Sequence, residues 1–137
     1  MSAPNIVKAF YSRIWNQGDL AASSDLLVKD FRFRGSLGLE LRGCDAFGEY
    51  VRSVRGALAD FNCEILDCAA EPNKAFAKMC FSGVHLAEFR GYQPTGKPVR
   101  WLGAALFQFQ GELISELWVL GDLVGLDAVL MANAKSN

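Results

Sequence analysis

Two polar residues that interrupt apolar strand patterns are the best candidates for chemistry in this sequence. His85, the only histidine, falls on the strand face that alternation gives to Met79 and Phe81. Asp122 ends the last predicted strand, where alternation places it on the same face as Trp118. An apolar pocket raises the pKa of a carboxyl toward the range useful for proton transfer. The two residues are therefore predicted to form an acid/base pair.

Each of the two has a structural alternative. A lone histidine on an apolar face is often a core residue whose nitrogens have found partners. Gly83 and Ala87, two positions to either side of His85, would leave room beside its ring and favour a cavity there. Asp122 opens the helical segment of residues 122–133 and is well suited to be its N-cap. Cap and catalyst both remain open for Asp122.

The same alternation gathers large apolar side chains that could line a pocket or pack densely against helices. Residues 31–35 alternate phenylalanine with arginine, and residues 99–109 place tryptophan and phenylalanine on one face. The expected pocket comprises Trp15, Phe31, Phe33, Met79, Phe81, Trp101, Phe107 and Trp118.

The stretch GYQPTGKPV matches the spacing G-x-x-x-x-G-K of a phosphate-binding loop through Gly91, Gly96 and Lys97. That loop needs a serine or threonine next and a helix N-terminus to bind phosphate. Here Pro98 follows, and then an alternating strand. We therefore expect a turn between two strands and no nucleotide site.

The elements that must position these residues divide into helices first and strands after. Apolar spacing predicts a helix over residues 4–16, a short second helix after Asp19 and a third between residues 45 and 61. Residues 31–35 and 39–43 are expected to pair as short strands. Residues 61–121 form four strand-like runs separated by short turn sequences, so consecutive runs should be antiparallel. The pattern predicts an α+β domain with helices on one face of a curved sheet.

Composition limits the functions that the chain can have. Its 137 residues suit one domain, residues 1–137, and 51% of them are hydrophobic. The net charge of −1 argues against a nucleic-acid partner. The absence of a leader-like or membrane-spanning apolar run favours a cytoplasmic protein without a membrane partner. The four cysteines show no C-x-x-C pairing, which favours free thiols and no metal site.

Two segments resemble the SnoaL-like polyketide cyclases, or ester cyclases, of the nuclear-transport-factor-2-like superfamily. FSGVHLAEFRGYQPTGKPV is similar to the family's G-T-H-x-G-E-F strand and P-T-G-K turn, and GELISELWVLGDLVGL is similar to its G-K-I-x-E-x-W strand ending in aspartate. The chain departs from that pattern at Val84, Ala87 and Leu113.

The resemblance implies a cone-shaped fold in which a curved antiparallel or mixed sheet and N-terminal helices enclose a pocket. It implies that Asp122 is the general acid/base and that His85 contacts the substrate's oxygens or assists proton transfer. The implied reaction is an intramolecular aldol closure of an aromatic polyketide ester, without metal or cofactor.

Three functions stay open. The first is a cofactor-free lyase or isomerase acting on a hydrophobic, cyclic or aromatic carbonyl compound by aldol closure, isomerisation or dehydration. The second is a small-molecule binding protein that uses the same pocket. The third is a dimeric interaction module. A homodimer or homotetramer is expected in any case, because the outer sheet face is apolar at Phe76, Val84, Leu86, Leu102, Ala104 and Leu106.

Overall fold

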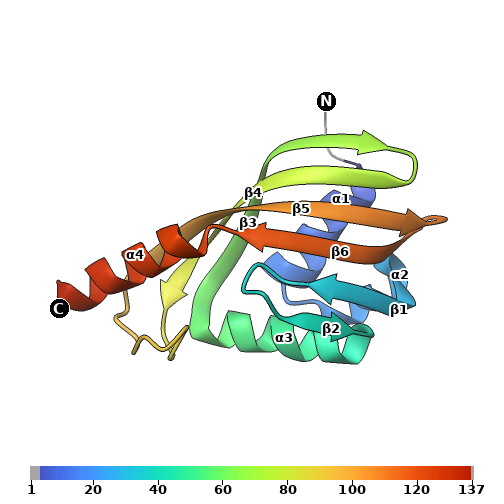
Figure 1. Ribbon diagram of the computed structural model, residues 1–137. Coiled ribbons are helices and arrows are strands. Elements are labelled where there is room, and N and C mark those ends of the chain that lie inside the picture. The colour runs from blue at the N-terminus through green and yellow to red at the C-terminus, as the bar shows by residue number, and fades with distance from the viewer. Residues whose placement is uncertain (1–3, 137) are drawn as a thin grey trace.

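The structure is a computed structural model that describes residues 4–136. Figure 1 shows a curved sheet with helices against one of its faces. The elements in chain order are α1 (Asn5–Ala9), η1 (Phe10–Asn16), η2 (Leu20–Ala22), α2 (Ser23–Leu26), β1 (Leu27–Arg34), β2 (Glu40–Arg42), α3 (Cys44–Ala57), β3 (Leu58–Glu71), β4 (Lys74–His85), β5 (Pro98–Gln110), β6 (Leu113–Gly121) and α4 (Leu123–Lys135).

All six strands belong to one sheet, in the order β2-β1-β6-β5-β4-β3. The runs from β3 to β6 pair antiparallel, as their short connections predicted. Strands β1 and β6 pair parallel, which their separation along the chain permits and which makes the sheet mixed. The predicted α+β class, with a curved sheet covered by the N-terminal helices, is confirmed.

The core lies between the sheet and the helical layer of η1 and α3. Phe10 of η1 stacks on Phe47 of α3 with ring centroids 5.8 Å apart, and it meets Phe107 of β5 edge to face at 5.6 Å. All three rings are fully buried. Burying a side chain of this size contributes about 2 to 3 kcal/mol each, so these contacts hold the helices on this one face.

The first helical segment differs from its prediction as a single regular helix. The chain is α-helical only through α1 and continues as the π-helix η1. The carbonyls at the end of η1 are bound by another element, since the Arg55 guanidinium donates to the oxygens of Trp15 at 2.6 Å and Asn16 at 3.0 Å. The Asn16 amide in turn pairs with the backbone N–H and carbonyl of Cys63. Tertiary contacts therefore hold this wider helix in place.

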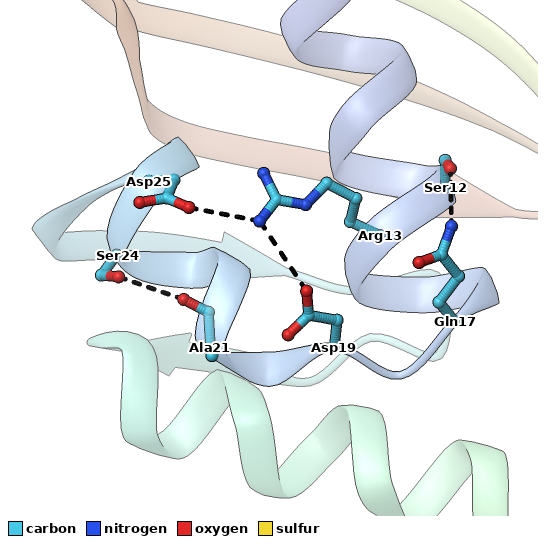
Figure 2. Close-up of polar contacts among 7 residues, drawn as sticks. All are labelled: Ser12, Arg13, Gln17, Asp19, Ala21, Ser24 and Asp25. Atoms are coloured by element: carbon cyan, nitrogen blue, oxygen red, sulfur yellow. Dashed lines mark hydrogen bonds and ion pairs between the residues drawn. The ribbon is translucent and has the colours of Figure 1, made fainter.

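A surface cluster ties η1 to the short helices after it, as Figure 2 shows. The Arg13 guanidinium lies 3.2 Å from the Asp25 carboxylate and 3.7 Å from that of Asp19. The Ser24 hydroxyl donates to the carbonyl of Ala21 within the same turn. These side chains are exposed, so each ion pair contributes at most about 1 kcal/mol. The cluster orients η1 more than it stabilises the fold.

Alternation predicts the second of the four runs as a strand over residues 74–91, but strand β4 is shorter, because pairing stops before the alternation does. The strand ends at His85, and residues 86–97 form a connection in which Phe89 and Tyr92 exchange two backbone hydrogen bonds of 3.0 Å. Gly91, Gly96 and Lys97 lie in this connection, and β5 follows it. The segment is therefore a turn between strands, as predicted for the phosphate-loop look-alike.

Helix α4 leaves the sheet after β6 and projects to the left in Figure 1. The Arg90 guanidinium binds the carboxylate of Asp127 in α4 through two hydrogen bonds of 2.8 and 3.0 Å. The Lys97 ammonium donates to the carbonyl of Asn133 at 3.3 Å. These contacts fasten the connection after β4 to the C-terminal helix.

All four cysteines are free thiols, which confirms the expectation for Cys63, Cys68 and Cys80. Burial raises the pKa of the Cys63 thiol well above its usual range. Within residues 4–136, no helix is both long enough and apolar enough to cross a membrane.

Candidate functional site

An aromatic cavity lies between the inner face of the sheet and the helices η1 and α3. Its empty space, mouth included, is about 380 Å³, of which the centre of a water molecule can occupy only about 20 Å³. A guest larger than a water molecule must therefore displace side chains. The cavity is lined by Tyr11, Trp15, Phe33, Ser36, Leu37, Tyr50, Val54, Phe61, Phe81, Trp101, Leu117 and Val119.

The opening of the cavity follows from the exposure of these lining residues. Ser36, Leu37 and Tyr50 are partly exposed, whereas the other lining residues are buried. Ser36 and Leu37 belong to the connection between β1 and β2. That turn and one tyrosine of α3 therefore form the mouth.

Close ring packing builds the inner wall. Phe81 and Trp101 lie on paired strands with ring centroids 5.1 Å apart, and Phe61 lies 5.2 Å from Trp15. Gly103 makes this packing possible, because a Cβ atom there would lie only 2.5 Å from the Phe81 ring. The wall offers flat apolar surfaces suited to a planar ligand.

The polar groups of the cavity are neutral. Burial raises the pKa of the Tyr11 phenol well above its usual range and that of Tyr50 to about 12, so both stay protonated near neutral pH. The Tyr11 hydroxyl has a weak contact, 3.7 Å, with the sulfur of Met79. The indole Nε1 of Trp101 is buried and has no hydrogen-bond partner within residues 4–136. The lining residues include no carboxylate and no cationic side chain.

His85 is completely buried, and within the described part of the chain neither of its ring nitrogens has a hydrogen-bond partner. It does not line the cavity, and its nearest aromatic neighbour is Phe89, at 6.4 Å between ring centroids. The space predicted at Gly83 is filled, because a Cβ there would lie 2.8 Å from the Cβ of Leu58. Ala87 lies beyond the end of β4 and is exposed. The glycine–alanine argument for a cavity beside His85 was therefore wrong.

Asp122 is the N-cap of α4, and its carboxylate accepts a hydrogen bond of 2.9 Å from the backbone N–H of Gly125. The cap alternative is thus confirmed, and the side chain is exposed outside the lining of the cavity. A capped carboxylate is held by the helix terminus that it stabilises.

The structure does not bring Asp122 and His85 together. The N–H of Asp122 donates to the carbonyl of Leu102, and the N–H of His85 donates to the carbonyl of Lys97. Asp122 directly follows β6 and His85 ends β4, and these two strands flank β5 on opposite sides. Lys97 directly precedes β5, so five residues of extended chain, or roughly 16 Å, separate these two carbonyls. The backbones of the two predicted partners are therefore well separated, and neither side chain lines the cavity.

The predicted pocket residues separate into three groups. Trp15, Phe33, Phe81 and Trp101 line the cavity. Phe31, Met79 and Phe107 are fully buried in the adjoining core and do not line it.

Trp118 lies on the outer face of the sheet, which corrects its assignment to the pocket. Its side chain is 46% exposed, and the Arg34 guanidinium carbon lies 5.5 Å from the ring centroid. The inner residues of β6 are instead its neighbours Leu117 and Val119. The face of Trp118 also carries Glu116, so the sequence held a polar signal that this face of β6 points outward.

The predicted pocket omitted eight of the lining residues, namely Tyr11, Ser36, Leu37, Tyr50, Val54, Phe61, Leu117 and Val119. Tyr11 and Tyr50 belong to the apolar stripes of their helices, so their stripes could have suggested an inward position. Ser36 and Leu37 lie in a turn that carries no periodic signal.

The fold has close relatives among solved structures. A candidate polyketide cyclase from Acidithiobacillus ferrooxidans matches with a TM-score of 0.83 at 22% identity, covering 97% of this chain and 99% of that one. TsrD from Streptomyces laurentii matches with a TM-score of 0.82 at 23% identity, covering 93% of each chain. IdmH from Streptomyces antibioticus, another candidate polyketide cyclase, gives 0.81 at 20% identity and covers 93% of this chain and 96% of its own.

At these identities the structural likeness establishes the fold and leaves the reaction open. No curated protein matches the sequence. The sequence model of the SnoaL-like polyketide cyclases, however, matches residues 5–130, which is nearly the whole chain. The chain therefore belongs to the SnoaL-like polyketide cyclase family.

Proposed function

We propose that the chain is a cofactor-free enzyme of the cyclase or isomerase type, whose substrate is a hydrophobic carbonyl compound with cyclic or aromatic character. The observation that carries this proposal is the aromatic cavity with a buried, unpaired indole N–H of Trp101 beside it. The aromatic rings of the cavity can bind the apolar part of such a ligand. The unpaired indole N–H favours a ligand that supplies an oxygen as hydrogen-bond acceptor.

Aldol closure and double-bond migration can share their first step. A base removes a proton from the carbon next to a carbonyl, and the resulting enolate oxygen needs hydrogen-bond donors around it. Tyr50 and Trp101 supply neutral O–H and N–H donors at the cavity. The carbonyl chemistry therefore matches the polar groups that are present.

His85 is the candidate base in this proposal. A neutral imidazole has one acceptor nitrogen, and no group in residues 4–136 occupies either nitrogen of His85. The Phe89 ring lies 6.4 Å from His85 and 6.1 Å from Trp101, between centroids. In this proposal Phe89, which packs against both rings, moves aside to admit the substrate to His85. Because Asp122 does not line the cavity, its acid/base role, which both the strand pattern and the resemblance suggested, now has only the resemblance in its favour.

Exchange of α-protons tests the shared first step without knowledge of the natural substrate. The protein is incubated in D₂O with 2-acetylnaphthalene, and loss of the methyl proton signal is followed by NMR. His85→Gln is expected to slow the enzymatic exchange by roughly 10²- to 10⁴-fold, the range for a removed general base. Asp122→Asn is expected to retain exchange if the carboxylate is only a cap. Unchanged exchange in His85→Gln would refute the assignment of the base.

A ligand-binding function without chemistry is the second candidate. The observation that favours it is that Asp122, the family's expected acid/base, is engaged as a helix cap away from the cavity. Saturable binding of the ketone, with no enzymatic exchange in the wild-type protein, would favour this function over catalysis.

A further inference from the structure

We propose that the indole N–H of Trp101 recognises the ligand's oxygen and that the cavity selects neutral compounds carrying a carbonyl at the edge of a planar ring system. This inference rests on the proposed function and adds the group that recognises the substrate. It assigns oxygen recognition to Trp101, whereas the resemblance assigns it to His85.

Trp101 carries a buried hydrogen-bond donor that finds no acceptor in the described part of the chain. Trp101 is 4% exposed, and its Nε1 has no acceptor within residues 4–136. Buried N–H groups are nearly always paired, because an unpaired one loses its hydrogen bond to water without replacement. A ligand acceptor at this point would remove that cost. Trp15 lines the same cavity, but its indole nitrogen is not among the buried unpaired atoms.

The indole N–H of Trp101 lies close to the mouth of the cavity. A Cβ atom placed on Gly121 would lie 3.4 Å from Nε1 of Trp101 and 2.9 Å from the Cβ of Ser36. The donor therefore lies beneath the turn that forms the mouth of the cavity. Only a residue without a side chain at position 121 allows the turn and the indole to approach so closely.

A ligand would have to pass the turn at the mouth of the cavity to reach this donor. Two backbone hydrogen bonds of 2.9 Å close the turn. The N–H of Gly35 donates to the carbonyl of Leu39, and the N–H of Gly38 donates to the carbonyl of Gly35. Gly38 has a φ of 93°, which glycine adopts without strain. Because the closed cavity admits little more than water, a ligand would displace Ser36 and Leu37 and bring its oxygen to Trp101.

The charge of the residues at the cavity limits the kind of ligand that it can bind. Arg34 is the cationic residue that leads into the turn, and its guanidinium donates to the carbonyls of Val119 at 2.5 Å and Gly35 at 3.2 Å. It also lies against Trp118 on the outer face. No lining residue could neutralise a carboxylate ligand, and the phenol of Tyr50, whose pKa burial raises to about 12, is protonated near neutral pH. An apolar cavity with neutral donors favours a neutral acceptor.

The test compares 2-acetylnaphthalene with 2-ethylnaphthalene, which keeps the ring and replaces the carbonyl by CH₂. Titration calorimetry of the wild-type protein is expected to give the ketone an affinity about tenfold higher, the contribution of one net hydrogen bond. Trp101→Phe should abolish this preference. Trp15→Phe removes an indole from the same cavity and should retain it.

A second readout covers the case in which Trp101→Phe does not fold. In ¹⁵N-labelled wild-type protein, the indole N–H signal of Trp101 should shift downfield with the ketone and not with the hydrocarbon. The signal is assigned by elimination from Trp15→Phe and Trp118→Phe. Equal shifts with both compounds would contradict hydrogen bonding to Trp101.

The outcomes separate this inference from the proposed function. Ketone binding with enzymatic α-proton exchange but without preference over 2-ethylnaphthalene would overturn the role of Trp101 alone. Binding of neither compound together with no exchange would overturn both. Tighter binding of 2-naphthoate than of the ketone would refute the selection of neutral ligands.

Discussion

The two faces of strands β4, β5 and β6 are both rich in apolar side chains, yet only the inner one is covered. On the inner face Met79, Ala105 and Phe107 are fully buried beneath the helices. On the outer face Phe76 and Trp118 are 51% and 46% exposed. Alternation separated the two faces correctly on β4 and β5, whose outer side also carries Lys78 and Arg100, but on β6 it assigned Trp118 to the pocket face.

The outer apolar residues are contiguous across the sheet. Phe76 of β4 pairs with Leu106 of β5, which pairs with Trp118 of β6. Ala104 and Leu120 form the next paired position, and Leu120 is 51% exposed. Since a patch of this kind usually marks an interaction surface, we propose that two copies of the chain associate through it.

The largest expected difference between the faces is in folding stability. Phe107→Ala should lower the free energy of unfolding by about 3 to 5 kcal/mol, because it leaves a cavity in the packed inner face. Phe76→Ala should change it by no more than about 0.5 kcal/mol in the monomer. Urea unfolding at low protein concentration measures both. Equal losses would mean that the outer face is packed in the monomer as well.

The second prediction concerns association. Trp118→Ala should raise the dimer dissociation constant by at least about 30-fold, the effect of losing an aromatic hot spot worth 2 kcal/mol or more. Val124→Ala on α4, where Val124 is 84% exposed, is the control outside the patch. Sedimentation equilibrium measures the constant. A wild-type protein that is monomeric at micromolar concentration would rule out this interface.

The third prediction uses the phenol of Tyr50, which lies at the mouth of the cavity and is largely, but not fully, removed from water. Burial raises the pKa of Tyr50 from 10.0 to about 12, partly offset by the backbone of Leu37 and by Arg34. Below pH 10 the phenol is protonated in both states. Between pH 10 and 12 the unfolded chain releases the proton first, so stability falls as the pH rises.

The loss attributable to Tyr50 over this range is on the order of 2 kcal/mol. Tyr50→Phe should show a correspondingly smaller loss, measured by urea unfolding at a series of pH values. Tyr92→Phe, in the connection after β4, provides the control for removal of a phenol elsewhere. Identical pH profiles for Tyr50→Phe and wild type would contradict the burial of the hydroxyl.

The smallest expected effect lies at the end of β6. Asp122→Ala should lower the free energy of unfolding by about 1 kcal/mol through loss of the cap on α4, whereas Asp122→Asn should be within a few tenths of wild type. Thermal unfolding measures both variants. If alanine and asparagine are equally stable, the hydrogen bond to Gly125 does not stabilise the helix.

Local patterns were sufficient to predict most elements of this protein. Helix α3, strands β5 and β6, the turn after residue 71 and the cap at Asp122 all follow from spacing or turn chemistry within a few residues. The same holds for the rejection of the phosphate loop at Gly96, since the strand that follows it is visible in the sequence. The family resemblance added the cone shape and the enclosed pocket.

The tertiary structure decided how these elements form a site. Alternation shows that Leu117 and Trp118 lie on opposite faces of β6, but the inner face depends on where η1 and α3 pack. His85 and Asp122 are apart because strand register places them at different points along β5, and register is a property of pairing between distant segments. The turn at Ser36 has no periodicity, so only its packing against Gly121 reveals that it closes the cavity.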